Sequence, residues 1–136
     1  MINFPILSNK KAKNLNSIGR AIGPSNALIL YEIAISKNNP VIILAENTQH
    51  AEQLKDEITF FNKDDCPIDL FPEWETLPYD SFSPHQDIVS QRLETLYQLT
   101  QNEHRVFIVP VNTLMMRMAP VDYIGKYLLI LKNEQR

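Results

Sequence analysis

The residues best placed to do chemistry stand before the first predicted helix, where Gly23-Pro24-Ser25-Asn26-Ala27-Leu28 occupies the position of a phosphate-binding loop. In nucleotide-binding α/β domains this loop ends in Lys-Ser/Thr. Its backbone amides cradle the phosphates, the lysine neutralises them and the hydroxyl binds Mg²⁺. Here proline removes an amide donor, Asn26 replaces the cation and Ala27 removes the hydroxyl. We therefore expect a degenerate phosphate loop at Gly23, Asn26 and Ala27, and no cofactor bound to this chain.

The other reactive side chains do not form a catalytic or metal-binding pattern. His85 lies two residues from Asp87, but both fall in the first turn of a predicted helix, where exposure to solvent is the simpler expectation. Cys66 is the single cysteine, which excludes an internal disulfide, and its acidic neighbours disfavour a thiolate. The three histidines and Cys66 lack the spacing of a zinc site. We expect no catalytic residues and no metal.

Length and charge limit the classes of function. A chain of 136 residues is one domain by the usual size range. The formal net charge of −3 gives no general attraction to nucleic acid or to an anionic membrane. No apolar run reaches the length of a membrane span, and the first residues lack a secretory signal pattern. We expect a soluble, cytoplasmic protein without a membrane partner.

Hydrophobic periodicity predicts alternating strands and helices. The expected elements are an extended lead-in (1–8), a basic stretch compatible with a helix (10–20), helices over 25–36, 47–61, 84–100 and 112–118, and strands over 41–44, 68–71, 106–109 and 127–131. The unbroken apolar runs at 41–44 and 106–109 are typical of strands buried on both faces. The pattern predicts an α/β fold, a parallel sheet with helices on both faces. We expect a lead-in at 1–20, the α/β domain at 21–131 and a linker from 132.

The helix expected over 47–61 has both a cap and an apolar face. Asn47 can cap it, and its apolar residues form one stripe: Ala51, Leu54, Ile58 and Phe61.

Two further features of the predicted helices concern packing. The helix from Pro84 should bury Val89, Leu93 and Leu96, with Tyr97 beside them. Near the end of the chain, Met115, Met116 and Met118 fit either gap filling in the core, which is the first expectation, or an adaptable contact surface.

The segment from Trp74 to Leu93, W-E-T-L-P-Y-D-S-F-S-P-H-Q-D-I-V-S-Q-R-L, reads as an ordered loop that leads into a helix. Trp74, Tyr79 and Phe82 supply large apolar anchors, and packing under their own loop is a simpler role for Trp74 than binding a ligand. The loop is therefore expected to have a structural or docking role.

Two further features fix how this loop meets the helix. Ser83-Pro84-His85-Gln86 matches a capping box, with Ser83 as the capping residue and Gln86 at the third helical position. Arg92 could bridge to Glu75 or Asp80 and hold the loop on the helix.

This segment resembles the amino-terminal module of bacterial transcription-repair coupling factors, which carries W-E-T-L-P-Y-D-x-x-S-P-x-x-x-I-x-x-x-R-L at the same place. That module is itself similar to the excinuclease protein UvrB. The latter's V-L-A-x-N-K, Q-I-D-x-x-R-x-x-A and V-V-A-S-V-S segments resemble residues 44–48, 86–96 and 108–113. The resemblance covers about residues 20–131 and implies a RecA/helicase-like fold with a degenerate phosphate loop. The connection from Phe71 to Ser83 is too short for the DNA-threading hairpin of UvrB.

The resemblance implies a non-catalytic scaffold module in a translocase that removes RNA polymerase stalled at DNA lesions. It implies contact with the excinuclease protein UvrA through a following domain, contact with other domains of the parent in cis, and RNA polymerase and DNA bound elsewhere. ATP and magnesium would belong to the parent's motor. The alternatives are a stand-alone nucleotide-binding or DNA-binding helicase-like domain. The first would need the missing lysine and the second a basic face.

Overall fold

The computed structural model describes residues 6–8, 16–19, 21–63, 66–74, 76, 81 and 83–127. At its centre is a parallel sheet in the order β3 (Val41–Ala45), β5 (Val106–Pro110) and β4 (Ile68–Leu70). In register, Ile43 lies beside Ile108, and Ile68 lies beside Val106. The expected α/β fold with a parallel sheet is confirmed.

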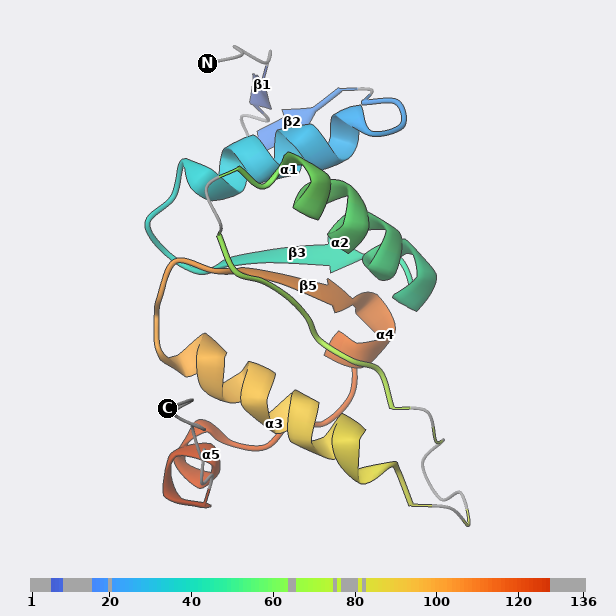
Figure 1. The fold of residues 1–136 in the computed structure, drawn as a ribbon, viewed down its shortest axis with the longest axis vertical. Helices are drawn as coiled ribbons and strands as arrows, with labels where there is room; N and C mark the ends of the chain where they lie inside the picture. Colours follow the sequence, from blue (N-terminus) through green and yellow to red (C-terminus); the bar gives the residue numbers. More distant parts are fainter. Residues whose placement is uncertain are drawn as a thin grey trace, which may run out of the picture.

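Helices cover both faces of this sheet, as expected. The helices α1 (Ser25–Ile35) and α2 (Thr48–Phe61) lie on one face, and α3 (Gln86–Thr100) lies on the other (Figure 1). Each face has its own apolar core. The larger core, under α1 and α2, contains Ala27, Tyr31, Ala34, Ile43, Ala45, Ala51, Leu54, Ile58, Cys66, Val106 and Ile108. The smaller core, under α3, contains Phe71, Phe107 and Val109, with Leu96 and Leu99 packed against them.

The central strand β5 is buried along its whole length, as its apolar run predicts. The edge strand β3 differs. Its Ile43 and Ala45 join the larger core, but Ile42 and Leu44 on the opposite face are each 54% exposed. The prediction that this strand is buried on both faces is therefore wrong. The reason is that α3 packs over β5 and the residue after β4, and leaves that side of β3 uncovered within the described chain.

The start of α2 follows the sequence prediction. The Asn47 side chain accepts a hydrogen bond from the backbone N–H of His50 at 2.8 Å, which satisfies one of the free donors of the first turn. Of the predicted stripe, Ala51, Leu54 and Ile58 are buried, and Phe61 is half-buried against the larger core. An N-cap and an apolar stripe thus set the position of α2 on the sheet.

The start of α3 differs from the capping-box prediction. The helix begins at Gln86, and its N-cap is His85, whose ring Nδ1 accepts from the backbone N–H of Asp87 at 3.3 Å. The extended backbone of His85, with ψ at 138°, keeps Ser83 and Pro84 ahead of the helix. The prediction of a Ser83–Gln86 capping box is therefore wrong.

Other differences lie toward the two ends of the chain. A strand β2 (Asn16–Ile18) pairs antiparallel with β1 (Ile6–Ser8), so the helical interpretation of 10–20 is wrong for these residues. The helix α4 (Val111–Leu114) is shorter than the predicted 112–118. Because α4 ends so early, Met115 lies outside the core at 82% exposure, which contradicts the expectation that it fills a gap there.

The last described element is a helix. In α5 (Val121–Tyr127), the Pro120 carbonyl accepts from the N–H groups of Tyr123 and Ile124, and Ile124 is buried. Tyr127 therefore ends a helix and does not begin a strand. The rest of the predicted strand, 128–131, lies outside the described residues. None of the described helices is long and apolar enough to cross a membrane.

The two interpretations of the start of α3 are separable by mutation. We expect His85→Ala to lower the free energy of unfolding by about 0.5–1 kcal/mol through the lost cap. Ser83→Ala should change it by less than about 0.5 kcal/mol, because Ser83 is exposed and precedes the helix. Urea denaturation of both variants measures the difference. If Ser83→Ala lowered the free energy of unfolding more than His85→Ala, the result would support the capping box and contradict His85 as the cap.

Candidate functional site

The segment Phe71–Trp74 follows β4 directly and lies where parallel strands end, the edge at which α/β proteins place binding residues. The Phe71 side chain is 1% exposed in the smaller core, and its N–H donates to the Ile108 carbonyl at 2.9 Å. Trp74 is half-buried. The segment is thus anchored at Phe71 and partly open at Trp74.

Arg92 of α3 contacts the Phe71–Trp74 segment directly. Its side chain is buried, at 3% exposure, and its Nη1 donates a hydrogen bond to the Pro72 carbonyl. The guanidinium carbon lies 4.5 Å from the ring centroid of Phe71 and 4.4 Å from that of Trp74. Both distances are within cation–π range. We call Arg92, Phe71 and Trp74 the Arg92 stack.

Burial lowers the pKa of Arg92 from its usual value, because desolvation disfavours the charged form. A guanidinium nevertheless stays protonated in proteins, so a cation is held inside the fold. Two aromatic faces and a carbonyl oxygen take the place of the water it has lost. The buried charge of Arg92 therefore has a structural role, because it holds Phe71, Pro72 and Trp74 against α3.

A second contact holds the segment from the side of α2. The hydroxyl of Thr48, the first residue of α2, donates to a carboxylate oxygen of Glu73. Glu73 thus bonds to α2, and the carbonyl of Pro72, one residue earlier, bonds to α3 on the other side of the sheet. The route of the chain out of β4 is fixed on both sides of the sheet.

The structure brings together two of the predicted loop residues, Trp74 and Arg92. Ser83 and Gln86 are exposed around the start of α3. The other loop residues named in the sequence prediction lie outside the described residues: Glu75, Tyr79, Asp80 and Phe82. The docking role of the loop stays a prediction.

The predicted degenerate phosphate loop lies at the start of α1. Gly23 adopts φ +60°, a left-handed conformation that suits glycine, and its carbonyl accepts from the N–H of Asn26 at 3.1 Å. Asn26 is exposed, whereas Ala27 is fully buried in the larger core. Pro24 stands at the N-cap position and makes no side-chain capping bond. Asn26 and Ala27 therefore point to different environments and do not form one site.

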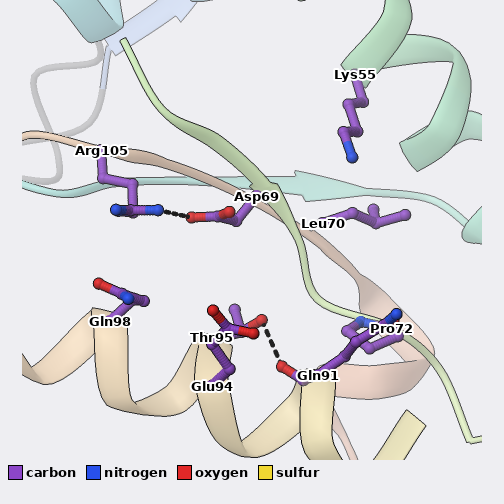
Figure 2. Close-up of a pocket in the computed structure, with 9 residues that line it drawn as sticks. All are labelled: Lys55, Asp69, Leu70, Pro72, Gln91, Glu94, Thr95, Gln98 and Arg105. Carbon is purple, nitrogen blue, oxygen red and sulfur yellow. Dashed lines mark hydrogen bonds and ion pairs between the residues drawn. The ribbon is translucent and has the colours of Figure 1, made fainter. Parts of the chain in front are cut away.

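A polar cleft of about 280 Å³ lies between β4 and α3, next to the Arg92 stack (Figure 2). The lining residues come from α2, from β4 and the segment after it, from α3, and from the residue before β5: Lys55, Asp69, Leu70, Pro72, Gln91, Glu94, Thr95, Gln98 and Arg105. Its roof is an ion pair, in which Arg105 Nη1 lies 2.6 Å from Asp69 Oδ2, and its floor is the polar face of α3 (Figure 2).

The cleft presents polar groups in which positive and negative charges balance. Its two cations, Lys55 and Arg105, are matched by the carboxylates of Asp69 and Glu94. The Thr95 hydroxyl donates to the Gln91 carbonyl at 2.8 Å, a bond within its own helix. Among the described residues, no three His, Cys, Asp or Glu side chains gather as a metal-ion site.

Comparison with known proteins identifies the family. No family model matches the chain. Curated transcription-repair-coupling factors are similar to it: that of Escherichia coli is 46% identical over 126 residues, 93% of this chain and 11% of that protein. That of Haemophilus influenzae is 35% identical over 88% of this chain and 10% of that protein, and that of Rickettsia prowazekii is 37% identical over 68% and 8%.

The chain is homologous to a segment of transcription-repair-coupling factors. This agrees with the resemblance carried by the Trp74–Leu93 segment. The chain spans about a tenth of the length of the curated relatives it matches. The homology therefore relates this chain to one segment of much longer proteins that are named for coupling transcription to repair.

Sequence reasoning missed two features of this site. It assigned the buried face of α3 to Val89, Leu93 and Leu96, which are only half-buried, whereas Arg92 and Thr95 are the buried side chains. A signal was present, because Arg92 lies three residues after Val89 and four before Leu96, on the same apolar stripe. The Asp69–Arg105 pair carried no such signal, since it joins residues 36 apart in sequence.

We expect Trp74→Ala to lower the free energy of unfolding by about 2–3 kcal/mol, since it removes one ring of the Arg92 stack. The loss should fall below that of a fully buried tryptophan because the ring is half-buried. Chemical denaturation measures it, with Met115→Ala, at a side chain that is 82% exposed after α4, as a control. If Trp74→Ala unfolded with the same free energy as the wild type, the ring would not support the fold.

Proposed function

We propose that this chain is a non-catalytic scaffold module of a transcription-repair-coupling factor, a protein whose name denotes the coupling of repair to transcription. The parent acts on RNA polymerase stalled at DNA lesions and recruits the excinuclease protein UvrA through a domain that follows this one. RNA polymerase and DNA contact other parts of the parent, in the cytoplasm. ATP and magnesium serve the parent's motor, outside this chain.

The observation that carries the scaffold role is the uncovered face of β3. Ile42 and Leu44 are each 54% exposed, on a strand composed only of apolar residues. Within the described residues, the outer edge of β3 is a second open surface, distinct from this face. Natural edge strands are normally protected by charges, prolines or bulges, because open edges pair with other chains. β3 has none of these features, and no described strand pairs with its outer edge. Such a strand needs a covering partner, and in a multidomain parent other domains supply it in cis.

The non-catalytic part of the proposal is supported by the start of α1. A working phosphate loop needs an accessible cation and a hydroxyl beside the phosphates. Here Pro24 and the exposed Asn26 occupy the turn, and Ala27 packs into the core with no exposed surface. A triphosphate at this position would meet no lysine ammonium and no magnesium ligand from these three residues.

We expect no measurable ATP binding at millimolar nucleotide, because Asn26 and Ala27 replace the residues that hold phosphate and magnesium. Isothermal calorimetry and thermal shift with Mg²⁺-ATP provide the measurement. The matched control is a triple variant, Pro24→Gly with Asn26→Lys and Ala27→Ser, which restores the missing groups. Saturable heat for the wild-type chain would contradict the proposal.

The scaffold role is testable in a chimera. The 126-residue matching segment of the E. coli factor is replaced by this chain, and we expect the chimera to retain preferential repair of the transcribed strand, whereas deletion of the segment abolishes it. Ile42→Thr with Leu44→Thr should leave the isolated chain nearly as stable, since both sites are exposed, but should destabilise the chimera.

Ile33→Ala, at an exposed site on α1, is the control for this pair and should leave the chimera unchanged. A folded chimera without repair would overturn the scaffold role. Equal stability of the chimera with and without the β3 substitutions would show that β3 is not the docking surface.

A further inference from the structure

A shallow pocket of about 360 Å³ lies between the start of α1 and the second half of α2, lined by Pro24, Asp56, Glu57, Phe60 and Phe61. The two helices lie side by side on the face of the sheet away from α3 (Figure 1). This pocket is therefore separate from the Arg92 stack and from the polar cleft.

The two phenylalanines of the pocket have different roles. Phe61 is half-buried and packs against the larger core. The Phe60 ring is 82% exposed and meets Phe61 edge to face, with centroids 5.2 Å apart. An edge-to-face contact orients the outer ring and leaves at least one of its faces free of Phe61. Phe60 thus presents a flat aromatic surface to solvent, beside the ring of Pro24.

Two carboxylates stand beside this aromatic surface. Asp56 is exposed, and one Glu57 oxygen accepts from Gln53 Nε2 at 2.7 Å. A carboxylate has about four acceptor positions, so Glu57 is oriented by this bond and can still accept others. Among the described residues that line the pocket, none is a lysine or an arginine. The negative charge at this pocket is therefore not matched by a cation of the pocket itself.

An aromatic face, an apolar floor and two carboxylates together fit a long cationic side chain. The aliphatic stem would lie on Phe60, Phe61 and Pro24, and the charged head would reach Asp56 and Glu57. Arginine suits this geometry better than lysine, because its planar guanidinium both stacks on a ring and pairs with carboxylates through several donors. We propose that this pocket binds an arginine side chain presented by a partner protein, independently of the scaffold role.

The test is an NMR titration of the ¹⁵N-labelled chain with the peptide acetyl-Ala-Leu-Arg-Ala-amide. The comparison peptide carries citrulline, which has nearly the same shape and no charge. We expect saturable shifts in residues 25–28 and 56–61, and a dissociation constant about tenfold larger for the citrulline peptide. Added salt should weaken only the arginine peptide. Equal affinity for both peptides, shifts confined to other residues, or no saturable shift at millimolar peptide would each overturn the proposal.

Substitutions then locate the site. Phe60→Leu, and Asp56→Asn combined with Glu57→Gln, should each weaken arginine-peptide binding several-fold. These positions are surface sites on α2, so the fold should be retained, and the unchanged spectrum outside the pocket checks this. Glu52→Gln removes an exposed carboxylate one turn earlier on the same helix and should leave binding unchanged. Equal weakening by Glu52→Gln would reveal attraction to net charge alone and would contradict a defined pocket.

Discussion

The fold depends on one buried cation. Arg92 is 3% exposed, and its guanidinium lies against Phe71 and Trp74 and bonds to the Pro72 carbonyl. Burying a guanidinium costs several kcal/mol unless its charge finds partners, so the aromatic rings and the carbonyl must be held in place. This requirement sets the route of the chain out of β4 and the position of α3. It also places the polar face of α3 opposite the Asp69–Arg105 pair, which forms the cleft.

The distribution of exposed apolar surface follows from how far the helices extend. α1 and α2 cover one face of the sheet, while within the described chain α3 packs on the other face over β5 and Phe71, the residue after β4. Ile42 and Leu44 of β3 are left to solvent, and Phe60 projects from the outer side of α2. Such surfaces suit a module that is held by neighbours, and they agree with homology to a segment of a much longer repair protein.

The parts of the fold that could be predicted from the sequence are those that local residue patterns determine. The apolar run at Val106–Pro110 is the buried central strand, and Asn47 caps α2 as its position before an apolar stripe indicates. Features that depend on tertiary neighbours were predicted less well. Whether both faces of β3 are covered depends on the extent of α3. For Arg92, the apolar stripe signalled a buried position, but its partners are two rings from another segment, which no local pattern indicates. At the start of α3, the sequence prediction placed the cap at Ser83, whereas the extended backbone at His85 makes His85 the N-cap.

The most direct test of the account is a double-mutant cycle between Arg92 and Trp74. The variants are Arg92→Met, which removes the cation and keeps a long side chain, Trp74→Leu, which removes the aromatic face and keeps an apolar side chain, and their combination. If the guanidinium stabilises the loop through the ring, unfolding free energies should give a coupling of about 1–2 kcal/mol. A coupling below about 0.3 kcal/mol, with the two single losses simply adding, would contradict the account: Arg92 would then hold the fold through the Pro72 carbonyl and Phe71 alone.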